Sequence, residues 1–107
     1  MFNVLNNFFY DYYLSYISYR ISNIKNVKDI TYIIQNITFF FKNATSDTII
    51  TILTDCFEKY PLTEKNTRNI SILHQNYEFS NGKEDYCCFV LWISIVYSIN
   101  NNYKSLL

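Results

Sequence analysis

The segment 5–24 constrains this chain most, because as a helix it is apolar around most of its circumference. At about 100° per residue, its polar side chains fall within one wedge roughly 80° wide. These polar residues are Asn7, Asp11, Ser15, Ser18 and Ser22. A surface helix of a soluble domain normally shows one apolar stripe, so a helix with more is buried on two sides or docked on a partner. The segment therefore indicates an interaction protein.

The apolar residues of this segment divide into two stripes. One stripe ends in tyrosines and comprises Leu5, Phe9, Tyr12, Tyr16 and Tyr19. The flank beyond it comprises Tyr13, Leu14, Ile17, Ile21 and Ile24. A tyrosine ring suits a surface that is dry on one side and wet on the other. We therefore predict that the tyrosine stripe faces outward, with its burial in the core as the alternative.

Length and charge restrict the class of protein. We expect one domain, 1–107, and a chain this long buries roughly two-thirds of its unfolded surface without a metal or a disulfide. Half of the residues are hydrophobic and 17% are charged, which is typical of a globular protein. Because the formal net charge is zero and no basic block is present, we expect no nucleic-acid partner. The longest apolar run, 86–99, is too short to span a bilayer, so we expect no membrane span.

The composition is strongly biased. Asparagine, isoleucine, tyrosine and phenylalanine are abundant, whereas glycine, proline, methionine and tryptophan each occur once. The abundant residues have A/T-rich codons, which indicates an AT-rich genome such as that of a large DNA virus, a phage, an organelle or a protist. Periodicity therefore carries more weight here than residue propensity. Three cysteines, an odd number, favour a reduced, intracellular protein over a secreted disulfide framework.

The segment 27–42 has the periodicity of an amphipathic helix. Asn26 can cap its N-terminus, with Asp29 near the positive end of the helix dipole. Tyr32 and Phe39 fall on the face opposite the apolar one, where we expect them to be exposed, as scattered surface aromatics or as contacts to a partner. The predicted apolar face comprises Val27, Ile30, Ile33, Ile34, Ile37, Phe40 and Phe41.

Three further helices complete the prediction. The segment 47–59 can be capped by Thr45 or Ser46; a strand is the alternative there, but period-two alternation fails in this segment. A weaker helix is predicted for 63–77, and a fifth helix, apolar nearly all round, for 84–99, where the asparagines that follow should end it. We expect the fifth helix to be the buried centre or to share an interface with the first. The fold class is therefore all-α, a compact single-domain bundle of five to six helices.

Few residues can carry chemistry. His74 is the only histidine, and its place beside an apolar stripe predicts a packed, hydrogen-bonded side chain rather than a catalytic one. Cys56, His74, Cys87 and Cys88 are possible zinc ligands. However, adjacent cysteines point about 100° apart on a helix, unlike the spacing of structural zinc sites. We expect no metal, no cofactor and no enzymatic activity.

Three short motifs carry a family resemblance. The first helix contains Ser-Tyr-Ile-Ser-Tyr-Arg-Ile at 15–21, and 61–72 reads Pro-Leu-Thr-Glu-Lys-Asn-Thr-Arg-Asn-Ile-Ser-Ile. A turn at Gly82 and a hydrophobic C-terminal helix follow. With these motifs the chain resembles the poxvirus Bcl-2-like family of small intracellular immune modulators, whose first helix often carries a Tyr-Ile-x-Trp-Arg-Asn-type run. Tyr19 stands in place of the family's Trp, and Ile21 in place of the Asn.

The resemblance implies a Bcl-2-like fold and binding rather than catalysis. Members of the family sequester host proteins of NF-κB or interferon-induction signalling, or pro-apoptotic helices, and several form homodimers through the first-helix face. Carried over to this chain, it implies that Tyr12, Tyr16, Tyr19 and Arg20 form an interface, and aromatic and Arg residues dominate interface energies.

The sequence thus predicts a viral protein of the host cytoplasm that inhibits innate-immune signalling or apoptosis by binding a host protein. A homodimer is a further expectation from the resemblance. The alternative is an accessory subunit of a larger mitochondrial or ribosome-associated assembly in an AT-rich organism. In that case neighbouring subunits would cover the apolar helices.

Overall fold

A computed structural model describes residues 4–79 and 82–106, with side chains at 8–79 and 82–100. The described residues form five helices and no strand, which confirms the all-α prediction and excludes the strand alternative in the third segment. The helices are α1 (Val4–Ser22), α2 (Val27–Phe40), α3 (Ser46–Lys59), α4 (Glu64–Asn76) and α5 (Gly82–Leu106).

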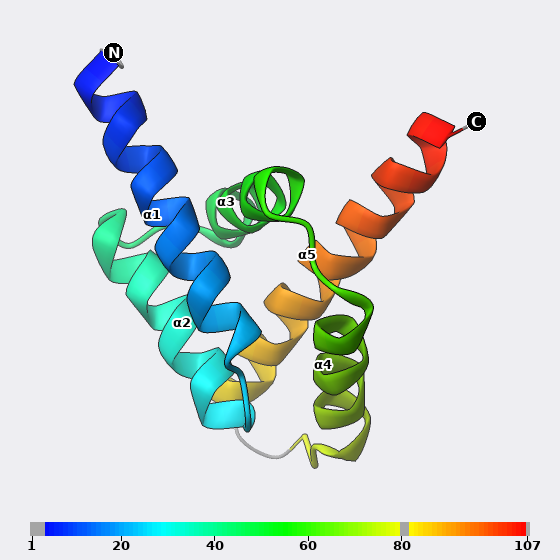
Figure 1. Ribbon diagram of the computed structural model, residues 1–107. Coiled ribbons are helices and arrows are strands. Elements are labelled where there is room, and N and C mark those ends of the chain that lie inside the picture. Colours follow the sequence, from blue (N-terminus) through cyan, green and yellow to red (C-terminus); the bar gives the residue numbers. More distant parts are fainter. Residues whose placement is uncertain (1–3, 80–81, 107) are drawn as a thin grey trace.

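Helix α5 is the central element of the bundle. It packs against α2, α3 and α4, whereas α1 packs against α2 and α3. Figure 1 shows α1 and α2 as an antiparallel hairpin on one side of α5 and α4 on the other, with the start of α1 and the end of α5 at the same end of the molecule. The outer surface of the α1–α2 hairpin therefore faces away from the rest of the bundle.

Branched aliphatic side chains fill the interior. On α1 the buried residues are those of the predicted flank, because α2 and α3 cover that side of the helix. Four isoleucines of α2 and the apolar face of α3 meet them, and α5 closes the core with Leu91 and Ile95. The fully buried large side chains include Ile17, Ile21, Ile30, Ile33, Ile34, Ile37, Ile49, Leu53 and Phe57.

The helix starts follow the capping residues that the sequence offers. Asn26 and Asp29 form a capping box at α2, in which each side chain accepts a hydrogen bond from the backbone N–H of the other. Thr45, rather than Ser46, caps α3, and Thr63 caps α4. These caps satisfy amides that have no partner within the first turn of a helix.

Helix α2 ends two residues earlier than predicted. Lys42 and Asn43 adopt left-handed backbone conformations, with φ of 53° and 60°. The Asn43 amide donates to the Thr38 carbonyl at 2.8 Å, which satisfies one of the last carbonyls of the helix and turns the chain toward α3. The first helix is likewise shorter than predicted and ends at Ser22, although Ile24 beyond it remains buried.

The prediction that the asparagines after 84–99 end the fifth helix is wrong, because α5 continues to Leu106. Asparagine in a helix interior is less favourable than alanine by only about 0.7 kcal/mol. Neither proline nor glycine follows in this stretch, so no residue there forces a stop. The far half of α5 consequently projects beyond the other helices (Figure 1).

Candidate protein-interaction surface

The tyrosine stripe of α1 lies on the outer surface of the molecule. Tyr12 is 72% exposed, Tyr19 is 67% exposed and Tyr16 is 38% exposed. Ile17, which lies between them in the sequence, is completely buried, because successive residues point about 100° apart around a helix. Burial of the tyrosine stripe in the core, the alternative considered from the sequence, is therefore excluded.

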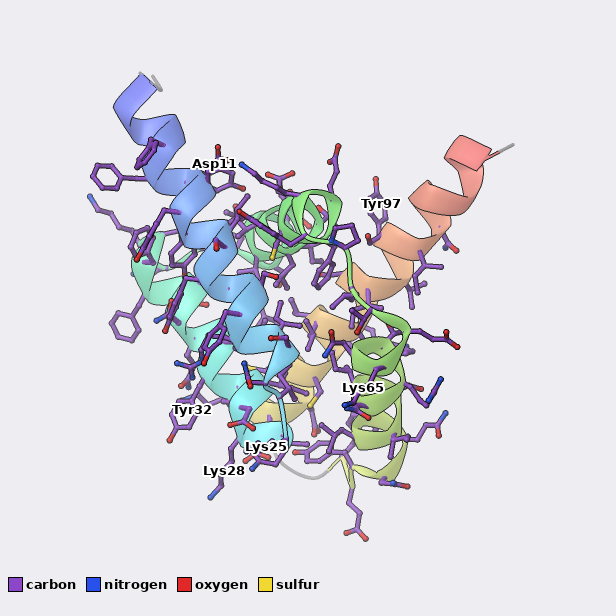
Figure 2. The ribbon with its side chains drawn as sticks, viewed as in Figure 1. Asp11, Lys25, Lys28, Tyr32, Lys65 and Tyr97 are labelled. Atoms are coloured by element: carbon purple, nitrogen blue, oxygen red, sulfur yellow. The ribbon has the colours of Figure 1, made fainter. Side chains whose placement is uncertain are left out.

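Helix α2 adds its own exposed aromatic rings beside this stripe. Tyr32 and Phe39 are both exposed, as predicted, and Figure 2 shows Tyr32 pointing away from the bundle. The prediction that Phe40 is buried is wrong. Its ring stacks on Tyr13 with centroids 4.3 Å apart, so one face is covered while the rest of the side chain meets solvent.

Contacts between α1 and α2 join the two helices that carry these rings. The Tyr13 hydroxyl donates to Asn36 Oδ1 at 2.6 Å, and the Tyr13 ring also packs edge-on against Phe41. Burial raises the pKa of Tyr13 above its ordinary value, so its hydroxyl remains a donor at physiological pH. We call the exposed rings of the hairpin the aromatic face: Phe8, Phe9, Tyr12, Tyr16, Tyr19, Tyr32, Phe39 and Phe40.

A pocket of about 180 Å³ opens between the two helices within this face. Ile17 and Ile33 are buried and form its floor. Tyr16 of α1 and Tyr32 of α2 form its walls. The remaining lining residues, Arg20 and Asn36, supply polar groups, so the pocket combines an apolar floor with hydrogen-bonding groups.

Arg20 is held at this pocket by its neighbour one helical turn away. One guanidinium nitrogen, Nη1, donates to the Tyr16 hydroxyl at 3.1 Å, and Arg20 Cζ lies 5.9 Å from the Tyr16 ring centroid. No carboxylate in the described part of the chain lies within ion-pair distance of Arg20. Since a guanidinium carries five N–H donors, most of them remain available to a bound group.

The residues considered for metal chemistry are not brought together. The thiols of Cys56, Cys87 and Cys88 are buried in the core; burial raises their pKa values, to about 12 for Cys56 and about 11 for Cys88. Cys56 donates its S–H to the Leu14 carbonyl at 3.4 Å. Within residues 4–79 and 82–106, no three His, Cys, Asp or Glu side chains gather so as to hold a metal ion.

The surroundings of His74 differ in part from the prediction. Its ring stacks on Trp92 at a centroid distance of 5.4 Å and meets Phe79 edge-on, so the side chain is packed as expected. However, its buried Nδ1 atom has no hydrogen-bond partner among the described residues, so the predicted hydrogen bond is not made by this nitrogen. Aromatic contacts on both sides hold the ring without a polar partner at that atom.

Sequence reasoning missed a second exposed apolar surface, on α5. Phe89, Val96 and Tyr97 are exposed although α5 is central, because α2, α3 and α4 do not surround the helix completely. The signal was present in the nearly all-round apolar character of the segment. The sequence predicted from that character either a buried central helix or an interface shared with the first helix, and not a separate exposed surface.

Comparisons with family models, with curated proteins and with solved structures found no match to this chain. None of the helices in the described part of the chain combines the length and hydropathy that crossing a lipid bilayer requires. The aromatic face and its pocket are therefore interpreted from their own chemistry.

Proposed function

We propose that this chain is a non-enzymatic interaction protein that binds a partner protein through the aromatic face. The observation that carries the proposal is the exposure of the tyrosine stripe on α1 beside Tyr32, Phe39 and Phe40 on α2, over a core already filled by aliphatic residues. Exposed aromatic patches of this kind mark interaction sites. Covering a fully exposed apolar side chain is worth up to about 1.5–3 kcal/mol before the costs of association are subtracted, so these rings can contribute strongly to a complex.

The resemblance described above supports a class of partner. We propose a host protein of innate-immune signalling, in the NF-κB or interferon-induction pathways, or a pro-apoptotic protein, bound in the host cytoplasm and thereby kept from its own partners. The all-α fold is compatible with this class of immune modulator. Tyr16 and Arg20, two residues of the motif in the first helix, line the pocket of the aromatic face.

One observation favours a second candidate function. The exposed apolar residues of α5 form another uncovered surface on a different helix. An accessory subunit of a larger assembly would bury both surfaces against neighbouring subunits. Solution behaviour separates the candidates, because such a subunit aggregates without its partners, whereas the proposed immune modulator is a soluble monomer or dimer.

The test of the proposal removes rings from the aromatic face. The double variant Tyr16→Ala, Tyr19→Ala should keep the helical circular-dichroism signal and lose capture of a partner from host-cell lysate, together with inhibition of an NF-κB or cell-death reporter. The matched control is Phe89→Ala, Tyr97→Ala, which removes two exposed rings from α5. The control should retain both activities.

Three results contradict the proposal. In the first, the wild-type protein would capture no partner and inhibit neither reporter. In the second, the double variant would bind as well as the wild type. In the third, the double variant would unfold. Unfolding would mean that the rings support the core rather than a binding surface. Loss of binding in the α5 control alone would transfer the function to the second exposed surface.

A further inference from the structure

A second pocket, of about 290 Å³, opens between α2 and the first turn of α5. It is lined by Lys28, Thr31, Tyr32, Gln35, Lys83 and Glu84. The pocket between α1 and α2 has a floor of buried isoleucines, whereas charged and polar side chains form most of this lining. Binding of a partner protein through the exposed rings of the hairpin makes no use of these polar groups.

The lining carries more positive than negative charge. Lys28 is exposed and forms no ion pair with any carboxylate in the described part of the chain. Lys83 adds a second ammonium group from α5. Glu84 supplies the one carboxylate among the lining residues, and the Tyr77 hydroxyl donates to its Oε2 atom at 3.2 Å. Two cations against one engaged carboxylate favour an anionic ligand.

The two ammonium groups belong to the same end of the pocket. Figure 1 shows α2 and α5 beginning at the same end of the molecule. Within the first turns of these helices, the side chains of Thr31 and Cys87 are hydrogen-bonded to each other. Lys28 lies three residues before Thr31, and Lys83 lies four residues before Cys87. Both lysines therefore precede this contact, one on each side of the pocket.

The lining residues of α2 follow one side of the helix in a fixed order. Lys28, Thr31, Tyr32 and Gln35 have the spacing i, i+3, i+4 and i+7, at which side chains are neighbours on a helix surface. At about 1.5 Å per residue, Lys28 and Gln35 lie about 10 Å apart along the axis of α2. The pocket is thus cationic at one end, aromatic beside the middle and uncharged at the other end.

The uncharged groups can recognise a polar ring. The Thr31 hydroxyl donates to the Val27 carbonyl at 3.2 Å, so its oxygen can still accept a hydrogen bond from a hydroxyl group of a ligand. The Gln35 side-chain amide both donates and accepts, which matches the edge of a heterocyclic base. The exposed Tyr32 ring offers a surface on which any such base can stack.

We infer that this pocket binds a nucleoside monophosphate. The phosphate lies between Lys28 and Lys83, the base stacks on Tyr32, and the edge of the base meets the Gln35 amide. A phosphate monoester suits two ammonium groups, because charge-assisted hydrogen bonds are the stronger ones. Small-ligand sites commonly enclose about 300–1,000 Å³, so a pocket of about 290 Å³ accepts one nucleotide and is too small for a dinucleotide.

The experiment titrates isotope-labelled protein with AMP, GMP, CMP and UMP in turn and follows the amide resonances by NMR. The largest shifts should fall on the residues that line the pocket. Adenosine lacks the phosphate and inorganic phosphate lacks the ring, so each should bind about tenfold or more weakly than AMP. Raising NaCl from about 0.05 M to about 0.5 M should weaken the binding of AMP and leave that of adenosine unchanged.

Variants with matched controls test the two halves of the site. Lys28→Gln with Lys83→Gln should weaken AMP binding about tenfold or more, whereas Lys65→Gln with Arg68→Gln, an equal loss of charge on α4, should leave it within about twofold. Tyr32→Leu should reduce the affinity for AMP to that for inorganic phosphate. Circular dichroism verifies that each variant is folded, and all of these side chains are exposed.

Four outcomes would overturn the inference. They are the absence of shifts with every nucleotide at about 5 mM, equal affinity for AMP and inorganic phosphate, equal loss of binding in the two charge variants, and tighter binding of O-phosphotyrosine than of any nucleotide. None of them bears on the proposed function. The Tyr16→Ala, Tyr19→Ala variant should bind AMP as the wild type does, because neither ring lines this pocket.

Discussion

The assignment of one α1 stripe to the core and the other to the surface predicts opposite responses to alanine. Ile17 is completely buried against the other helices, whereas Tyr19 is 67% exposed and extends into solvent. The two residues lie two positions apart on the same helix, in the same sequence neighbourhood. A comparison of Ile17→Ala with Tyr19→Ala therefore isolates burial from local helix stability.

The expected difference is large. Ile17→Ala removes three carbons from a filled core and leaves a cavity, which costs about 2–5 kcal/mol. Tyr19→Ala removes a larger side chain, but the lost surface contacts are offset by the better helix propensity of alanine, so its effect stays within about 0.5 kcal/mol. For 107 residues the unfolding entropy is about 0.2 kcal/mol per kelvin, so a loss of about 3 kcal/mol lowers Tm by about 13 °C.

Thermal unfolding followed by circular dichroism, with urea titration as a second measure, gives both values. The expected result is a Tm drop of roughly 10–20 °C for Ile17→Ala and of about 2 °C or less for Tyr19→Ala. Similar destabilisation by the two substitutions, or a larger effect of Tyr19→Ala, would refute the assignment of the stripes. The outward aromatic face would then have no physical basis.

Three other predictions concern the contacts that hold the hairpin and the core. Tyr13→Phe removes the hydroxyl that donates to Asn36 and should lower the unfolding free energy by about 1 kcal/mol in urea titration; no change would show that the bond is exchanged for water. Asn26→Ala breaks the capping box of α2 and should cost about 1 kcal/mol, whereas Asn26→Ser should restore most of it. Burial raises the pKa of Cys56 to about 12 and of Cys88 to about 11, from an ordinary value of 9.0, so above pH 9 the unfolded chain loses these protons first. The free energy of unfolding should therefore keep its full value below pH 9 and fall as the pH rises toward 12. A thiol reagent at pH 8 should label these cysteines in the native protein only as fast as the protein unfolds. Rapid labelling would contradict their burial.

The sequence predicted the helices well because apolar spacing and capping residues both act locally. The spacing in 47–59 identified the buried face of α3, and Asn26 with Asp29 identified the start of α2. The exposed positions of Tyr32 and Phe39 also followed from their place opposite an isoleucine face. In each case, one helix and its immediate flanks contained the information.

The remaining features depended on where the helices lie relative to one another. Phe40 belongs to the apolar arc of α2, yet its exposure is decided by α1, whose Tyr13 ring covers only one side of it. The exposed part of α5 depends on how much of its circumference α2, α3 and α4 leave uncovered. The pocket between Tyr16 and Tyr32 likewise exists only because two helices meet there, so periodicity along either helix could not reveal it.

The turn between α2 and α3 shows how the biased composition meets the demands of the backbone. Lys42 and Asn43 occupy the left-handed region that suits glycine, at a cost of about 1 kcal/mol for the lysine. The chain's one glycine, Gly82, instead begins α5 with an ordinary negative φ, where an added Cβ would meet open space. Glycine is thus absent where the backbone would gain from it and present where alanine would fit. The fold carries this mismatch as a small local strain, which a single codon change at position 42 could relieve without touching the aromatic face.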